Sequence, residues 1–212
     1  MITAIIPTLN EEDQIADTIV CLRNQTIPID EIIVVDSGSS DATVEIAQNM
    51  GCIVLRGEKN IGYNWEMGTQ AARNNIILSI DADTWLPHDW VERALAWFET
   101  DENVMAVVGA LAPKNPTPDN IWFCERRNEM DQTMQRSACV IFIRPEGPVW
   151  CWNNLCHSWG EFSHLKENLA DGITVYDMEL IAWTDIPPDQ PILLRRALAV
   201  PFYAFFLSLL FI

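Results

Sequence analysis

Short apolar runs alternate with amphipathic stretches along the first half of the chain. The runs are rich in β-branched residues, which is typical of strands buried on both faces of a sheet. They lie at Ile2–Thr8, Glu31–Val35, Cys52–Leu55 and Asn75–Ile80. Strands that alternate with helices in this way predict an α/β fold with a mostly parallel central sheet and helices on both faces.

The stretches between these runs repeat their apolar residues at the spacing of an α-helix. Asn10 is predicted to cap the first helix, and the acids that follow it, Glu11 to Asp13, suit the positive end of the helix dipole. Gly51 marks the end of the second helix. The remaining predicted elements are a helix over Gly62–Arg73, a helix from Pro87, a strand over Val104–Gly109, a helix over Asn120–Arg136 and a strand over Ala138–Ile143.

Polar residues stand at the ends of three predicted strands, at Thr8, Asp36 and Asp81. Ligands of parallel sheets bind beyond the carboxyl ends of the strands, so these residues indicate a binding site. If the strand stays extended to its end, Asp81 and Asp83 point to the same side. Two such carboxylates suit Mg²⁺ or Mn²⁺, which take few protein ligands and complete their shell with substrate phosphates. The alternative is a polar turn whose aspartates cap the next helix.

The charge balance narrows the classes of partner. The 212 residues include 13 basic and 30 acidic side chains, which gives a net charge of −17. This charge argues against a nucleic-acid partner, and an anionic substrate would need a bound cation as a bridge. Hydrophobic residues make up 49% of the chain, which excludes disorder.

Three segments resemble the motifs of family 2 glycosyltransferases with the GT-A fold. They are Ile-Ile-Pro-Thr-Leu-Asn-Glu-Glu at 5–12, Val-Val-Asp-Ser-Gly-Ser-Ser-Asp-Ala-Thr at 34–43 and Ile-Asp-Ala-Asp-Thr at 80–84. The resemblance covers about residues 2–112. It implies an inverting transfer of a sugar from a nucleotide-diphosphate donor.

The resemblance also implies roles for single residues. The nucleoside pocket would be lined by Pro7, Thr8, Asn10 and Glu11. Asp36 would hydrogen-bond the base, Asp81 would contact the ribose or the sugar, and Asp83 would hold the metal on the diphosphate.

The third predicted helix departs from the family pattern. Members of the family often carry an Arg-Asn pair before a glycine there, and this chain has Trp65-Glu66-Met67-Gly68. Arg73 or Lys59 could replace the missing basic contact to the diphosphate. The alternative for both is a solvated surface charge.

An acceptor-side Glu-Asp pair is expected near the end of such a domain. The most similar stretch here is Tyr176-Asp177-Met178-Glu179-Leu180, which resembles that pair with a tyrosine in place of the glutamate. The resemblance implies that Asp177 is the general base. The alternative is an acid at the N-terminus of a helix.

The chain ends in an uncharged apolar segment, 198–212, that follows Arg195-Arg196. As a helix it would be about 22 Å long, shorter than the roughly 30 Å core of a bilayer. It is predicted to lie in or partly enter the membrane interface, with the arginines near cytoplasmic headgroups. A helix packed on the protein's own core is the alternative.

The sequence therefore predicts a metal-dependent glycosyltransferase at the cytoplasmic face of a membrane, with a lipid or glycan acceptor that could be a polyprenyl phosphate. Residues 1–112 would bind the nucleotide sugar, 113–190 would form the acceptor side, and 191–212 would be the hydrophobic membrane-associating tail. Two alternatives stay open. One is a membrane-bound nucleotide-sugar-binding protein that has lost catalysis, and the other is a sugar-nucleotide pyrophosphorylase.

Overall fold

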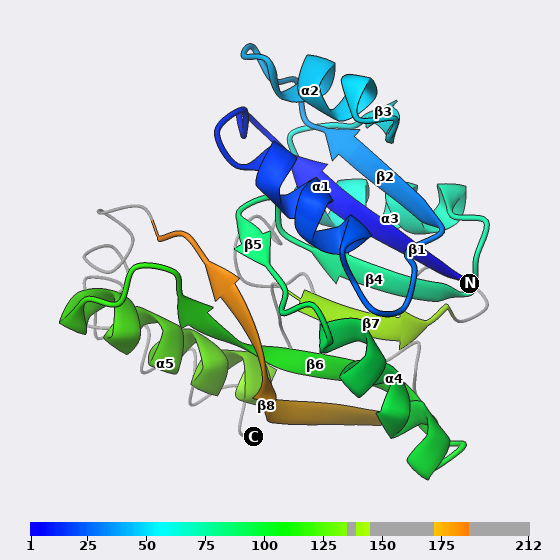
Figure 1. Cartoon of the computed structure of the whole chain (residues 1–212), viewed down its shortest axis with the longest axis vertical. Helices are drawn as coiled ribbons and strands as arrows, with labels where there is room; N and C mark the ends of the chain where they lie inside the picture. Colours follow the sequence, from blue (N-terminus) through cyan, green and yellow to red (C-terminus); the bar gives the residue numbers. More distant parts are fainter. Residues whose placement is uncertain (135–138, 145–171, 187–212) are drawn as a thin grey trace, which may run out of the picture.

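The computed structural model describes residues 1–134, 139–144 and 172–186, and within them the chain forms one eight-stranded sheet flanked by helices (Figure 1). The strands are β1 Ile2–Thr8, β2 Glu31–Asp36, β3 Ile53–Arg56, β4 Ile76–Ile80, β5 Thr84–Trp85, β6 Val104–Pro113, β7 Cys139–Ile143 and β8 Ile173–Thr184. The helices are α1 Ile15–Arg23, α2 Thr43–Asn49, α3 Ile61–Ala71, α4 Trp90–Thr100 and α5 Pro118–Met134.

The strand order is β3-β2-β1-β4-β7-β6-β8-β5. Strands β1 to β4 run parallel, β7 is antiparallel to both of its neighbours, and β6 and β8 are parallel to each other. The predicted α/β fold with a mostly parallel sheet is confirmed. The chain passes outward from β1 to β3 and then returns to the other side of β1 as β4, which makes a topological switch point between β1 and β4. Such a point opens a crevice at the carboxyl ends of the strands.

Helices cover both faces of the sheet, as predicted (Figure 1). On one face, the apolar sides of α1, α2 and α4 share a core with the alternate β1 residues Ile2, Ala4 and Ile6. On the other face, α3 packs Trp65 against Ile5 and the apolar residues of β2 and β7. Because both faces are covered, β1 and β2 are buried along their whole length, and their carboxyl ends are held rigidly.

Two helix starts differ from the sequence prediction. The first helix begins at Ile15, and Asn10 does not cap it. Asn10 instead has a left-handed backbone with φ of 58°, a conformation that asparagine tolerates better than most residues. The fourth helix begins at Trp90, whose N–H donates to the carbonyl of Pro87 in a turn that precedes the helix (3.0 Å).

The segment around Asp177 is a strand, so its interpretation as the N-terminus of a helix is wrong. The ladder between β8 and β6 runs from Ile173 to Thr184, with a register shift after the pair of Asp177 and Gly109. Pairing with an existing strand satisfies the backbone of this segment, so tertiary contacts decide its conformation.

None of the helices within the described residues is both long and apolar enough to cross a membrane. The predicted tail at 191–212 lies outside the described residues, and its interfacial placement stays a prediction. The boundary predicted at residue 112 falls within β6, so the two predicted halves share one sheet.

Candidate functional site

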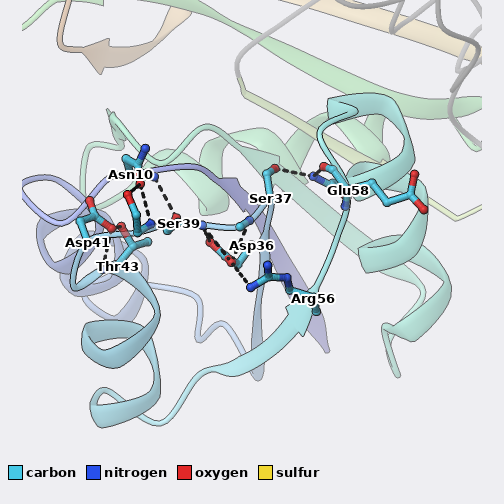
Figure 2. Close-up of polar contacts among 11 residues, drawn as sticks. Asn10, Asp36, Ser37, Ser39, Asp41, Thr43, Arg56 and Glu58 are labelled. Atoms are coloured by element: carbon cyan, nitrogen blue, oxygen red, sulfur yellow. Dashed lines mark hydrogen bonds and ion pairs between the residues drawn. The ribbon is translucent and has the colours of Figure 1, made fainter.

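The loops after β1 and β2 are joined by hydrogen bonds at the carboxyl end of the sheet (Figure 2). The backbone N–H of Asn10 donates to Ser39 Oγ (2.8 Å), and Asn10 Oδ1 accepts from the N–H of Ser40 (2.9 Å). The N–H of Glu11 donates to Thr43 Oγ1 at the start of α2 (2.7 Å). The left-handed backbone of Asn10 therefore serves to link the two loops.

Asp36 organises the loop that follows β2. Its side chain is buried, and its oxygens accept from the N–H groups of Gly38 and Ser39, both at 3.0 Å (Figure 2). The guanidinium of Arg56 lies 3.7 Å away. Gly38 has a φ of 101°, which a residue with a side chain rarely adopts. Asp36 thus shapes this loop, and its predicted contact with a base would use the remaining lone pairs of the carboxylate.

The predicted nucleoside-pocket residues of β1 lie beside this loop. Pro7 and Thr8 are buried at the end of β1, opposite Val35 and Asp36 of β2. The hydroxyl of Thr8 is buried and has no hydrogen-bond partner among the described residues. A buried hydroxyl without a partner is costly, so a ligand that bonded it would gain stabilisation. The structure brings Pro7, Thr8, Asn10 and Glu11 to the same edge of the sheet as Asp36, and their role in a nucleoside pocket stays a prediction.

The aspartates after β4 lie in a turn. β4 ends at Ile80, and the N–H of Thr84 donates to the carbonyl of Asp81 (3.2 Å). The extended geometry expected to align Asp81 with Asp83 is therefore absent at this point. The charge of Asp81 acts on Cys139, the β7 residue that pairs with Ile80, whereas the charges of Asp185 and Arg127 act on Asp83.

Asp185 is a site residue that the sequence analysis missed. It follows β8, and its N–H donates to the carbonyl of Asp83 (3.1 Å). Its carboxylate accepts from the Gln14 amide (3.1 Å). Burial raises the pKa of Asp83, and the nearby Asp185 carboxylate raises it further, while the charge of Arg127 opposes the rise. No local motif marks Asp185, because only the pairing of β5 with β8 brings it here.

Asp83 links Glu11 and Asp185 electrostatically, because its charge acts on Glu11 and the charge of Asp185 acts on it; the three residues are called the acidic cluster. Burial raises the pKa of Glu11 to about 7, and the charges of Asp83 and Asp41 add to the rise. Carboxylates forced together in this way attract a cation. Within the described part of the chain, no three acidic, histidine or cysteine side chains are placed to hold one metal ion together.

The acidic cluster nevertheless fits Mg²⁺ or Mn²⁺. The pKa of Asp83 stays raised although the charge of Arg127 opposes the rise, and Asp185 offers a second hard oxygen ligand beside it. These ions bind through one or two carboxylates and fill their other positions with water and phosphate oxygens. Asp83 and Asp185 are therefore the residues that would hold such a cation.

The stability of the protein should depend on pH through Glu11. Its folded-state pKa of about 7 exceeds the ordinary value of 4.5, so the folded state holds the proton more tightly than the unfolded state. The stability linked to this proton is complete below pH 4.5 and is lost as the pH rises through 7. Glu11→Gln removes this titration. We therefore expect its melting temperature, relative to wild type, to rise between about pH 5 and about pH 8.

The control for this prediction is Glu99→Gln, which changes an exposed glutamate on α4. Its melting temperature relative to wild type should stay constant over the same pH range. A constant difference for Glu11→Gln as well, measured by thermal denaturation, would show that Glu11 has no raised pKa.

Asp177 is not brought to the acidic cluster. Its carboxylate accepts from Trp97 Nε1 of α4 and from the N–H of Glu179, both at 2.9 Å. It lies opposite Gly109 of β6, whereas Thr184, next to Asp185, lies opposite Pro113. Four residues of β6 separate these two levels, roughly 13 Å at about 3.3 Å per residue. The role of Asp177 as a base stays a prediction.

The two proposed replacements for the missing basic contact differ in position. Arg73 lies at the amino end of β2, where its backbone N–H donates to Glu31 (3.0 Å) and its side chain pairs with the same carboxylate (3.5 Å). Arg73 is therefore at the wrong end of the sheet for this role. Lys59 is exposed and precedes Asn60, the N-cap of α3, so its role stays a prediction.

Solved structures share this fold. Glucosyl-3-phosphoglycerate synthase from Mycobacterium tuberculosis, in complex with Mn²⁺, UDP and phosphoglyceric acid, matches with a TM-score of 0.64 and 19% identity, over 91% of this chain and 73% of that one. The mannosyltransferase PcManGT from Pyrobaculum calidifontis, in complex with GDP-Man and Mn²⁺, matches with a TM-score of 0.63 and 19% identity, over 88% of this chain and 57% of that one. At such identities the likeness shows the fold alone.

Curated relatives match by sequence. The putative glycosyltransferase EpsH of Bacillus subtilis is 33% identical over 166 residues, which are 73% of this chain and 46% of that protein. Hyaluronan synthase of Streptococcus pyogenes is 30% identical over 129 residues, which are 54% of this chain and 30% of that protein. The chain thus spans less than half the length of these relatives. The sequence model described as Glycosyl transferase family 2 matches residues 3–147. The chain therefore belongs to glycosyl transferase family 2.

Proposed function

We propose that the protein transfers a sugar from a nucleotide-diphosphate donor to an acceptor with the help of a divalent cation. The observation that carries the proposal is the convergence of the Asp36 loop, the Thr8–Glu11 segment and the acidic cluster at one switch point of the sheet. Family membership supports the activity, and the solved structures of this fold with Mn²⁺ and UDP or GDP-Man support the cation and the donor class.

The residues of this chain divide the work between binding and charge. The Asp36 loop and the Thr8 hydroxyl would hold the nucleoside. Asp83 and Asp185 would hold the cation, which when bound neutralises charge on the departing diphosphate. In a single in-line displacement, the acceptor oxygen bonds to the anomeric carbon while the bond to the diphosphate breaks. This step inverts the configuration of the sugar.

The proposed acceptor is a membrane lipid phosphate of the polyprenyl type, used at the cytoplasmic face of a membrane. The apolar segment 198–212 supports a lipid, because it would keep the site near the bilayer. The position of Asp177 supports a phosphate. A hydroxyl needs a base to remove its proton, whereas a phosphate monoester, with a second pKa of about 6, is already anionic at neutral pH.

The function can be tested by measuring nucleoside diphosphate release. The chain is incubated with UDP-glucose, UDP-N-acetylglucosamine or GDP-mannose, with and without Mn²⁺, and with undecaprenyl phosphate in phospholipid vesicles. We expect release from one donor that requires both Mn²⁺ and the lipid phosphate. Donor binding without release would favour the alternative of a binding protein that has lost catalysis. The absence of donor binding would contradict the proposal.

Asp177→Asn should keep most of its turnover with the lipid phosphate acceptor. The variant removes a carboxylate that we place away from the acidic cluster and preserves one acceptor for the Trp97 N–H. Removal of a true general base typically costs about 10²–10⁴-fold in rate. A loss of that size in a variant that still binds the donor would restore Asp177 as the base and favour a hydroxyl acceptor.

A further inference from the structure

Helix α5 is fixed to β6 by one asparagine. The pairing of β6 with β7 ends at Val108. Past that point, both the N–H and the carbonyl of Leu111 form hydrogen bonds with the side-chain amide of Asn128. The N–H of Leu111 donates to Asn128 Oδ1 (2.8 Å), and Asn128 Nδ2 donates to the carbonyl of Leu111 (2.9 Å). The side-chain amide thus replaces a neighbouring strand. This pair of bonds sets the rotation of α5 about its axis, and the helix runs alongside β6 (Figure 1).

Arg127 lies on the side of α5 that faces the sheet. Cys124 is buried on the side of α5 that faces the sheet, and Arg127 follows it by three residues on the same side. Arg127 is half-buried, and its charge opposes the rise that burial causes in the pKa of both Asp83 and Cys124. The adjacent Arg126 instead pairs with Glu129 on α5 itself. Two neighbouring arginines of one helix therefore face different surroundings.

The site needs a further positive charge. A nucleotide diphosphate adds negative charge to an acidic cluster in a chain whose net charge is already −17. The α3 stretch where family members often have an Arg-Asn pair reads Trp65-Glu66-Met67-Gly68 here, so it carries a buried acid and no basic residue. Arg73 lies at the opposite end of the sheet. Arg127 precedes Asn128, which bonds Leu111 two residues before Pro113, and Pro113 pairs with Thr184 beside Asp185.

We propose that Arg127 binds the diphosphate of the donor beside Asp83 and so provides from α5 the basic contact that α3 lacks. This inference rests on the proposed function. A guanidinium stays charged at every physiological pH and bonds phosphate oxygens in a bidentate manner. When the bond to the anomeric carbon breaks, its electron pair stays on the terminal diphosphate oxygen. Arg127 would stabilise that oxygen together with the cation.

The test compares Arg127→Gln with Arg126→Gln, two variants that remove the same charge from adjacent positions of one helix. Calorimetry measures the affinities for UDP, GDP, UMP and GMP in the presence of Mn²⁺. For the nucleoside diphosphate that wild type binds, Arg127→Gln should weaken affinity by about 10- to 100-fold, because a charge-assisted bond is lost. Its affinity for the monophosphate, and both affinities of Arg126→Gln, should stay within about 3-fold of wild type.

Three outcomes would overturn the proposal. Equal diphosphate affinities and equal transfer rates of the two variants would exclude Arg127 and leave the proposed function standing. Equal losses for monophosphate and diphosphate would place the contact on the nucleoside or the first phosphate, which both ligands share, and not on the terminal phosphate. Normal diphosphate affinity with slower transfer to undecaprenyl phosphate would move the contact to the phosphate of the acceptor. If wild type bound neither UDP nor GDP, the proposed function itself would fail, and this inference with it.

Arg127→Lys guards against a purely structural effect. It keeps the positive charge and most of the side-chain length but loses the bidentate geometry. We expect a melting temperature close to that of wild type and a loss of diphosphate affinity smaller than that of Arg127→Gln. If the two variants lost equal affinity and melted at equally lowered temperatures, Arg127 would be a structural residue of α5.

Discussion

Asp83→Asn is expected to abolish the Mn²⁺-dependent part of nucleoside diphosphate binding and to lower sugar transfer at least about 100-fold. The expectation follows from the acidic cluster. The carbonyl of Asp83 accepts from the N–H of Asp185, and the charge of Asp83 acts on Glu11. A neutral amide is a poor ligand for a hard cation, and the departing diphosphate would then lack its neutralising charge. Calorimetry with and without Mn²⁺ measures the binding, and release of nucleoside diphosphate measures the transfer.

The same variant should melt at a higher temperature than wild type at neutral pH. Burial and the Asp185 carboxylate raise the pKa of Asp83, so its ionised form is disfavoured in the folded state. The asparagine variant carries no charge at this position, so its folded state is not destabilised by a buried carboxylate. A loss of binding in this variant could therefore not be ascribed to unfolding. Stabilisation by removal of a functional charge is a common trade between stability and activity.

Asp13→Asn is the matched control, because it makes the same chemical change at an exposed position in the turn before α1. Its Mn²⁺-dependent affinity and its melting temperature should both equal those of wild type. Unchanged Mn²⁺-dependent affinity in Asp83→Asn would show that Asp83 is not a ligand of the cation.

Asp36→Ala should destabilise the fold and remove nucleoside binding at the same time. The buried carboxylate accepts from the N–H groups of Gly38 and Ser39, and alanine leaves both without that partner. The expected loss is about 2–4 kcal/mol in the free energy of unfolding. The loop would also lose the shape that holds Ser39 against Asn10, and with it one wall of the predicted nucleoside pocket. Urea denaturation measures the stability, and nucleotide calorimetry measures the binding.

Asp41→Ala provides the comparison within the same loop. Asp41 is only partly buried and accepts from the N–H groups of Glu12 and Thr43, and water can take over these bonds. The variant should therefore be clearly more stable than Asp36→Ala. Asp36→Asn keeps one acceptor oxygen and should retain the fold if the alanine variant does not. If Asp36→Ala and Asp41→Ala were equally stable, the buried carboxylate would not be what organises the loop.

The sequence alone determined the parallel half of the fold and the residues at its strand ends. Runs such as Ile2–Thr8 and Glu31–Val35 are mostly apolar, and that pattern favours a strand covered on both faces. Because the carboxyl ends of parallel strands meet at one edge, the sequence predicts that Thr8, Asp36 and Asp81 lie at that edge. The loops after β1 and β2 lie close together because both begin at that edge.

Only the tertiary structure decided what surrounds Asp83. Asp185 reaches it because β8 pairs with β5 and β6, a contact between residues far apart in the sequence. The charge of Arg127 acts on it from α5, a helix that Asn128 ties to Leu111. Asp177, whose local sequence resembles an acceptor-side motif, lies in a strand and bonds Trp97. Local hydrophobic patterns report which side of an element is buried, whereas strand order and register, which are set by long-range pairing, decide which charges share a site.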